Sequence, residues 1–202
     1  RQAPDVILIG EIRDRETMTS ALSYALSGHL VLATMHANNS YHALSRIMSF
    51  YTPEARPALR SDLGAGMRAI VSQRLLRASA GGRIPAVEVM FNTKLVSEMI
   101  EQGDFSGIRE AMEKSMAEGS RSFEEAIAHL IASKEISRDE GMAHSDSVTN
   151  LLWRLDNQAP SAARLAPRSE EFDEPEFTDF VVDVIPEGFV PRRGSSFPSL
   201  QA

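Results

Sequence analysis

The chain contains no cysteine. It therefore has no disulfide framework, no zinc site built on thiolates and no cysteine nucleophile. Long apolar runs are also missing, because no stretch approaches the roughly 20 residues that a helix needs to span a bilayer. We therefore expect a cytoplasmic protein with no direct membrane insertion, which reaches a membrane only through partners.

Positive charge is in the minority. The formal net charge is -7 at pH 7 and the pI is about 5.3. Phosphate backbones and anionic lipids need a basic face, so a protein that binds nucleic acid or lipid is disfavoured. The hydrophobic content of 43% over 202 residues is ample for a packed core. A globular protein of one or two domains is expected.

The first 34 residues follow a strand, helix and strand pattern. Residues 6–9 form a short aliphatic run, typical of a strand buried on both faces in a parallel sheet. Apolar residues recur at helical spacing over residues 16–27, and Gly28 tolerates the left-handed backbone that ends a helix. Residues 30–34 repeat the strand pattern. The pattern predicts two parallel strands joined by a right-handed crossover.

Helical spacing dominates the rest of the chain up to residue 157. We predict helices over residues 40–50 and 53–76, and an edge strand over residues 84–90 after a Gly-Gly turn. Beyond that strand the chain is predicted to be wholly helical, over residues 93–102, 104–118, 122–134, 137–144 and 145–155. Two serines, Ser122 and Ser137, each precede a glutamate by three residues, which is the spacing of a capping box.

The composition changes after residue 157. Residues 158–202 hold six of the ten prolines, and residues 170–187 hold eight acidic residues without any Lys or Arg. Such a segment buries too little apolar surface to offset its ordering entropy, so a disordered tail is predicted. Phe172, Phe177 and Phe180 lie among the acids. They are either a stray apolar cluster or a docking motif that becomes ordered on a partner.

Two polar side chains follow the ends of the predicted strands. Glu11 comes one glycine after the first strand, and His36 comes soon after the second. Ligands of open parallel sheets bind outside the carboxyl ends of the strands, so the two face one crevice if the strands are neighbours. A carboxylate there can orient water or hold Mg²⁺-bound water, and a histidine can stabilise phosphate charge. On geometry alone, Glu11 as a solvated turn residue and His29 or His36 as surface or capping groups stay open.

The local sequence resembles a known family. Residues 1–14 (RQAPDVILIGEIRD) resemble, position by position, the Walker B signature of the type II and type IV secretion and pilus ATPases. Residues 28–38 (GHLVLATMHAN) resemble the histidine box of that family, and residues 67–75 (MRAIVSQRL) resemble a further segment. With the helical region, the resemblance covers about residues 1–157.

The resemblance implies an α/β fold with a RecA-like P-loop ATPase core. Residues 1–91 would be the C-terminal portion of that core, residues 92–157 a helical C-terminal region, and residues 158–202 the disordered tail. The implied cofactors are ATP and Mg²⁺.

The resemblance also implies roles for individual residues. Glu11 corresponds to the Walker B glutamate, which organises Mg²⁺ through water at the γ-phosphate. His29 and His36 correspond to the histidine-box residues that respond to the nucleotide state, and they join Glu11 as the implied catalytic residues. Arg13 and Asp14 belong to the same nucleotide-site motif as Glu11, and we expect their role to be structural or inter-subunit.

Part of the family's machinery is not in this sequence. No G-x-x-x-x-G-K-[ST] P-loop occurs in the 202 residues. The P-loop, an acidic box with the catalytic glutamate and a PAS-like domain would lie upstream of Arg1. We therefore expect the chain to be a fragment of a longer protein, truncated at its N-terminus and inactive by itself.

The missing cysteines also bear on the branch of the family. Assembly and type II secretion ATPases commonly carry a four-cysteine zinc site, so its absence favours the retraction ATPases of the PilT/PilU group. PilT members resemble a pattern A-I-R-N-L-I-R-E, and here Ser97 and Glu101 stand where the two arginines would fall. This departure, together with the acidic tail, resembles the PilU members more.

The function implied by the resemblance is that of a homohexameric motor. Such a ring hydrolyses ATP to power pilus retraction and twitching motility, together with another retraction ATPase and an inner-membrane platform protein. One alternative is an accessory ring that acts with a partner motor. Others are a type II secretion or pilus assembly ATPase and, more distantly, a DNA-translocating ATPase, which the acidic charge disfavours.

Overall fold

The computed structural model describes residues 4–115 and 117–157. The first unit is a parallel pair of strands, β1 (Val6–Ile9) and β2 (Leu30–Ala33), joined by helix α1 (Arg15–Leu26). The strands are in register from Val6 opposite Leu30 to Ile9 opposite Ala33. Gly28 has φ +97 just after α1, a conformation that costs glycine little. The predicted β-α-β unit is confirmed.

The two strands differ from the sequence prediction in their burial. Met18, Ala21 and Leu22 of α1 are buried, so one face of the strand pair is covered. The opposite face is open within the described residues, and its four side chains are between 48% and 60% exposed: Val6, Leu8, Leu30 and Leu32. The prediction of strands buried on both faces is therefore wrong for this part of the chain, because an aliphatic run reports a strand's preference for burial and not which elements cover it.

A long hairpin replaces the second half of one predicted helix. Helix α2 (Ser40–Ser49), a 3₁₀ turn η1 (Pro53–Ala55) and helix α3 (Arg56–Gly66) come first. Strands β3 (Ala69–Arg77) and β4 (Arg83–Phe91) then pair antiparallel, with Ser72 opposite Glu88. The helix predicted over residues 53–76 thus ends at Gly66, and the strand predicted over residues 84–90 is confirmed.

The physical reason for this difference lies in the pattern of β3. Its inward positions alternate with exposed ones, but two of them, Ser72 and Arg74, are polar. The period of two that would have marked a strand was therefore hidden in the sequence. Pairing with β4 decides the conformation, and such non-local pairing overrides local propensity.

Between the hairpin and residue 157, the described part of the chain forms five helices, as predicted. They are α4 (Lys94–Gln102), α5 (Ile108–Ser115), α6 (Phe123–Ala132), α7 (Arg138–His144) and α8 (Val148–Asn157). The Ser122 hydroxyl accepts from the backbone N–H of Glu125, and that of Ser137 accepts from Glu140. Both serines are therefore N-caps, as their spacing indicates.

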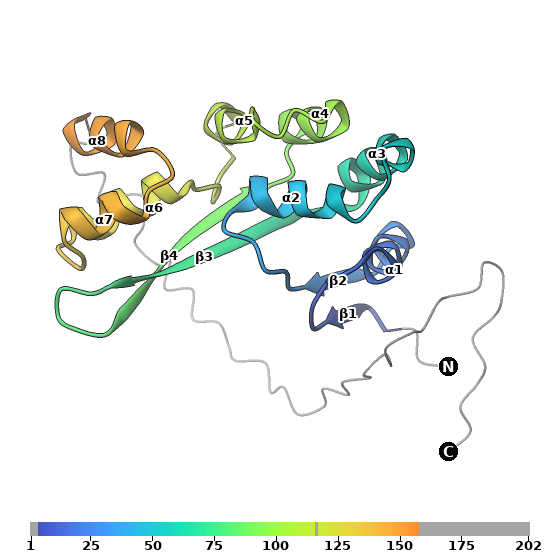
Figure 1. The fold of residues 1–202 in the computed structure, drawn as a ribbon, viewed down its shortest axis with the longest axis horizontal. Coiled ribbons are helices and arrows are strands. Elements are labelled where there is room, and N and C mark those ends of the chain that lie inside the picture. Colours follow the sequence, from blue (N-terminus) through green and yellow to red (C-terminus); the bar gives the residue numbers. More distant parts are fainter. Residues whose placement is uncertain (1–3, 116, 158–202) are drawn as a thin grey trace, which may run out of the picture.

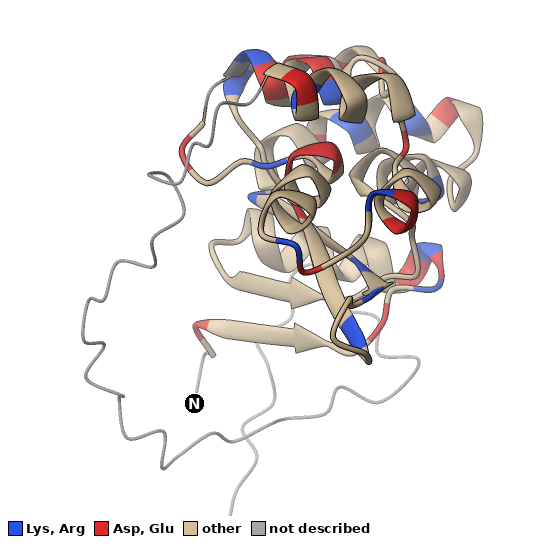
Figure 2. Ribbon diagram, turned by 90° about the vertical axis from the view of Figure 1, so that its left-hand side faces the viewer, with Lys and Arg blue, Asp and Glu red and all other residues tan. Residues whose placement is uncertain are grey.

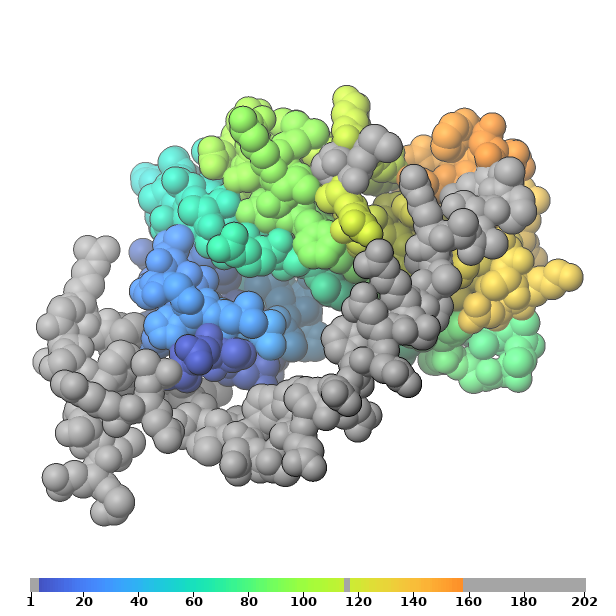
Figure 3. Space-filling view, turned by 180° about the vertical axis from the view of Figure 1, so that it is seen from behind, coloured from blue at the N-terminus to red at the C-terminus, as the bar shows by residue number. Residues whose placement is uncertain are grey.

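The core is divided into two clusters that share the hairpin. The first holds side chains of α1 to α5 and Met90 of β4, and the second holds Leu76, Ala86 and side chains of α6 and α8. Figure 1 shows the hairpin passing from beneath α2 toward α6 and α7. Figure 3 shows the first elements of the described chain, in blue, on one side and its last helices, in orange, on the other, with α4 and α5, in green, between them.

Helices α4 and α5 pack on the first cluster, although the predicted domain boundary at residues 91 and 92 would group them with α6 to α8. That boundary stays a prediction. Figure 2 shows acidic and basic residues interspersed on the helices, with the strands mostly uncharged. Within the described ranges, no helix is long and apolar enough to cross a membrane. The predicted tail, residues 158–202, lies outside the described residues.

Candidate active site at the carboxyl ends of β1 and β2

Glu11 lies two residues beyond the end of β1 and is held by Arg13. The guanidinium donates from Nε to Glu11 Oε2 over 2.7 Å, and Nη2 lies 2.6 Å from the same oxygen. This hydrogen bond lowers the pKa of the Glu11 carboxyl below its ordinary value. Glu11 is therefore ionised at neutral pH.

His36 lies beside Glu11, because the two strand ends remain paired. The backbone N–H of Ile12 donates to the Thr34 carbonyl over 2.9 Å, and the Thr34 hydroxyl donates to the Gly10 carbonyl. Nε2 of His36 is 3.3 Å from Glu11 Oε1, and the imidazole side chain is 83% exposed. The structure thus brings Glu11 and His36 together at one sheet edge, with the imidazole open to a ligand.

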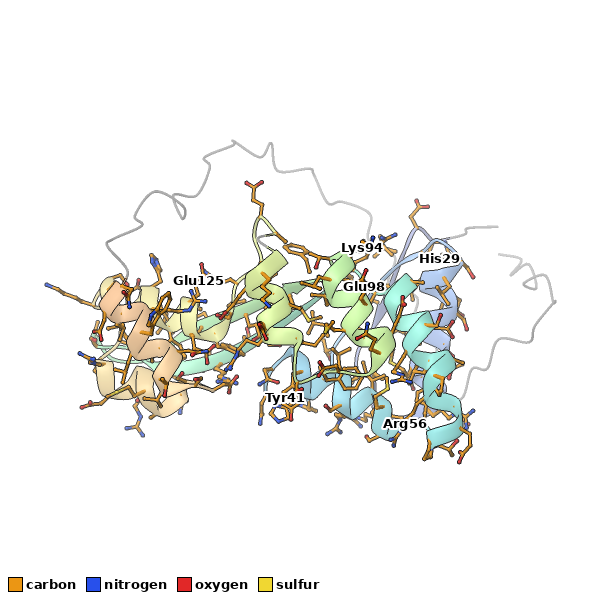
Figure 4. All side chains as sticks on the ribbon, turned by 90° about the horizontal axis from the view of Figure 1, so that it is seen from above. His29, Tyr41, Arg56, Lys94, Glu98 and Glu125 are labelled. Carbon is orange, nitrogen blue, oxygen red and sulfur yellow. The ribbon has the colours of Figure 1, made fainter. Side chains whose placement is uncertain are left out.

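His29 lies at the other end of β2. It precedes Leu30, so the four residues of the strand separate it from the edge where Glu11 lies, a distance of about 13 Å at about 3.3 Å per residue. Its Nδ1 is 3.1 Å from the Tyr24 carbonyl, and its ring meets the Tyr24 ring edge-on. Figure 4 shows His29 well apart from Tyr41, the second residue of α2. His29 does not join the Glu11 and His36 pair within this chain.

Asp14 serves the start of helix α1. Its Oδ1 accepts from the backbone N–H of Thr17 over 2.8 Å, and this bond lowers the pKa of the Asp14 carboxyl. An N-cap of this kind satisfies a backbone donor that the helix leaves without a partner. Of the three polar residues of the motif at 11–14, Glu11 is thus the one next to His36, with Arg13 bound to it and Asp14 capping the helix.

The loop that carries His36 also has partners that sequence analysis missed. The Asn38 carbonyl accepts from Arg74 of β3, and the Asn39 amide donates to Asp146. The signal that the sequence offered for Arg74 is its place in the segment 67–75, which resembles the family. Because that segment was predicted to be a helix, the inward direction of the Arg74 side chain from a strand was not predicted.

The family model described as type II/IV secretion system protein matches residues 1–145. This chain belongs to that family.

The relatives of the chain include pilus ATPases of Pseudomonas aeruginosa. The type IV pilus ATPase PilU is 41% identical over 152 residues, which cover 75% of this chain and 40% of that protein. The type IV pilus retraction ATPase PilT is 31% identical over 139 residues, which cover 69% of this chain and 40% of that protein. The chain therefore spans about two fifths of the length of these curated relatives.

A solved structure shares the fold. The crystal structure described as that of the pilus retraction motor PilT with bound ADP superposes with a TM-score of 0.67 at 28% identity, covering 76% of this chain and 43% of that one. The mixed α/β fold and the resemblance to the PilT/PilU group are confirmed. The roles of Glu11, Arg13, Asp14, His29 and His36 stay predictions.

The residues present fit part of a nucleotide site. Among the described residues, no group of three or more His, Cys, Asp or Glu side chains could hold a metal ion directly. An ionised carboxylate such as Glu11 suits an indirect contact, since Mg²⁺ keeps several of its waters when bound to protein. The N–H groups and lysine of a P-loop would have to come from residues outside this sequence.

Proposed function

We propose that this chain is part of an ATP-hydrolysing motor that drives retraction of type IV pili, and that Glu11 and His36 form the hydrolytic edge of its nucleotide site. The observation that carries the proposal is the 3.3 Å approach of Glu11 Oε1 and His36 Nε2 beyond two parallel strands. This is the edge at which α/β sheets bind their ligands.

The chemistry divides between the two side chains. ATP bound with Mg²⁺ supplies the γ-phosphoryl group and a metal that offsets its charge. Glu11, kept ionised by Arg13, would hold metal-bound or attacking water by accepting hydrogen bonds from it. His36 would present its exposed imidazole to the phosphate, and a hydrogen bond from Nε2 to Glu11 would orient the ring.

The proposed biological setting is based on the relatives. The name of the PilT relative supports a role in pilus retraction, with twitching motility as the movement that retraction would drive, and the higher identity to PilU favours the PilU side of the group. We propose a homohexameric ring in the cytoplasm, held at the inner membrane by a platform protein and working with another retraction ATPase.

A second candidate is an accessory ring, and one observation favours it. Ser97 and Glu101 occupy the positions of the two PilT arginines, and both lie against Gly64 of α3, where the Ser97 hydroxyl donates to the Gly64 carbonyl over 3.2 Å. These positions therefore serve the packing of α4 on α3 instead of presenting a cation. An accessory ring would hydrolyse ATP yet need its partner motor for retraction.

The experiment that tests the proposed site is His36→Ala in the full-length protein. Turnover should fall by about 10²-fold, the scale of one lost proton-transfer or charge-stabilising group, while ATP affinity stays close to that of the parent. The matched control is His129→Ala on α6, since His129 is exposed and belongs to the other half of the molecule. Equal turnover in the parent and His36→Ala would remove His36 from the site.

A further inference from the structure

The loop of residues 34–39 holds His36 between two anchors. On its upstream side Thr34 is bound to the end of β1 through Gly10 and Ile12. His36 itself contributes little to its own placement, because its side chain is 83% exposed and meets Glu11 at 3.3 Å. The position of the imidazole therefore depends on how the downstream side of the loop is held.

Arg74 of β3 is the first part of the downstream anchor. Its Nε and Nη2 donate to the Asn38 carbonyl over 3.3 and 3.2 Å, and its Nη1 donates to the His144 carbonyl over 2.6 Å. The guanidinium carbon lies 3.9 Å from the centre of the Phe123 ring, which is fully buried. A planar guanidinium can make these contacts together, whereas the single nitrogen of a lysine cannot.

Asp146, in the turn between α7 and α8, is the second part. Its Oδ1 accepts from Arg74 Nη2 over 2.6 Å, and its Oδ2 accepts from Asn39 Nδ2 over 2.9 Å. Asn39 is buried and is also the N-cap of α2, since its Oδ1 accepts from the backbone N–H of His42. One carboxylate thus ties β3 to the start of α2, using both of its oxygens as acceptors.

The turn that carries Asp146 is itself held. The buried Glu124 of α6 accepts from the backbone N–H of Ser147 over 2.9 Å and from the Ser145 hydroxyl over 3.4 Å. Satisfied buried networks of this kind fix a single arrangement. The anchor therefore connects the His36 loop to helices that begin 84 or more residues further along the chain, counted from residue 39 to the start of α6 at residue 123.

We infer that Arg74 and Asp146 are positioning residues for His36. They act through the loop of residues 34–39, so that the arrangement of α6, α7 and α8 sets where the imidazole stands relative to Glu11. A movement of these helices then displaces the His36 loop in the nucleotide site, and a movement of that loop displaces the helices. The inference rests on the proposed function, because His36 has to act on a bound nucleotide.

The test is a double-mutant cycle of Asp146→Asn and His36→Ala in the full-length protein. The asparagine side chain has one oxygen that accepts and one NH₂ group that donates. Its oxygen can accept from Arg74 while its NH₂ faces the Asn39 amide, or it can accept from Asn39 while its NH₂ faces Arg74, so one of the two hydrogen bonds is lost. Asp146→Asn alone should lower turnover by about tenfold, the effect of one lost charge-assisted hydrogen bond, with the KM for ATP little changed. The matched control is Glu110→Gln, which opens the exposed pair with Lys114 on α5.

The cycle separates positioning from general stability. In the His36→Ala background, Asp146→Asn should change turnover by no more than about twofold, because the group it positions is gone. Arg74→Lys should behave in the same way. Effects that multiply in the double variant would overturn the inference, since they would mean that Asp146 acts independently of His36.

Hydrogen exchange provides a readout that does not depend on activity. Backbone amides of residues 34–39 should exchange faster in Asp146→Asn than in the parent, while amides of β1 and β2 keep their protection. Unchanged exchange in the loop would contradict the inference. The proposed function fails separately, because it fails if His36→Ala alone has no effect on turnover.

Discussion

A buried carboxyl group, that of Glu88, lies where the two halves of the molecule meet. Glu88 of β4 is 6% exposed, and its Oε1 accepts from the backbone N–H of Ser40 over 2.8 Å at the start of α2. A carboxylate there also benefits from the positive end of the helix dipole. Burial nevertheless raises the pKa of Glu88, and the negative charge of Asp146 adds to this while Arg74 and Ser40 oppose it.

The raised pKa gives a prediction for stability. Since the folded-state pKa of Glu88 lies above its ordinary value of 4.5, its contribution to stability is fully present below that value and is lost as pH rises through the folded-state pKa. Glu88→Gln keeps the acceptor for Ser40 and removes the titration. The unfolding free energy of the parent minus that of Glu88→Gln should therefore decrease between pH 5 and pH 8.

Urea unfolding of both chains across that pH range measures the difference. Comparing the two variants cancels the groups that titrate equally in both. A difference that stays constant or increases with pH would contradict the prediction, because it would mean that ionising Glu88 costs the folded state little free energy.

The sequence predicted some site residues and missed others for a definite reason. Glu11 and His36 were predictable because each follows a strand whose pattern is local. Arg74 and Asp146 were not, because they are 72 residues apart and meet only through the fold. His29 shows the converse case. It belongs to the same sequence motif as His36, but it lies at the opposite end of strand β2 from Glu11 and His36.

At the scale of elements, the helices were more predictable than the hairpin. Apolar spacing and serine caps are local signals, and α6 and α7 begin where Ser122 and Ser137 predict. The hairpin depends on the pairing of β3 with β4, and its inward Ser72 and Arg74 carry no apolar signal. The polar contacts of Arg74 explain why an arginine occupies an inward strand position.

The turn of the hairpin gives a prediction at this scale. Gly81 has φ +93, which a residue with a Cβ adopts only with strain, although the space around it is open. Gly81→Ala should therefore lower the unfolding free energy by about 1–2 kcal/mol. Gly10→Ala is the matched control for local sterics, because a Cβ there also meets no atom within 4 Å and the backbone is not strained.

Chemical denaturation of both variants distinguishes the cost of backbone strain from the cost of making room for an added methyl group. Equal stability of Gly81→Ala and the parent would mean that the turn adjusts its backbone at no cost.

At the scale of the whole molecule, two clusters of core residues share one hairpin. Met90 of β4 belongs to the first cluster, and Ala86 four residues earlier belongs to the second. The hairpin therefore connects helices α6 and α8 with the part of the molecule that carries Glu11 and His36. The α/β class and the family were predictable from motifs, whereas the division of the core between α5 and α6 was not, because it depends on which helix faces meet.

Phosphate release measures most directly whether Glu11 belongs to the hydrolytic site of an ATPase. Gln keeps the size of Glu but removes the charge that holds metal-bound water. In the full-length protein, Glu11→Gln should bind ATP, but its rate of phosphate release should fall by about 10²-fold or more. Glu98→Gln is the matched control, since Glu98 is exposed on α4 and is not part of the edge formed by Glu11 and His36. The 202-residue chain, which contains no P-loop motif, should release none. Turnover by this chain alone, or a Glu11→Gln variant as active as its parent, would contradict the account.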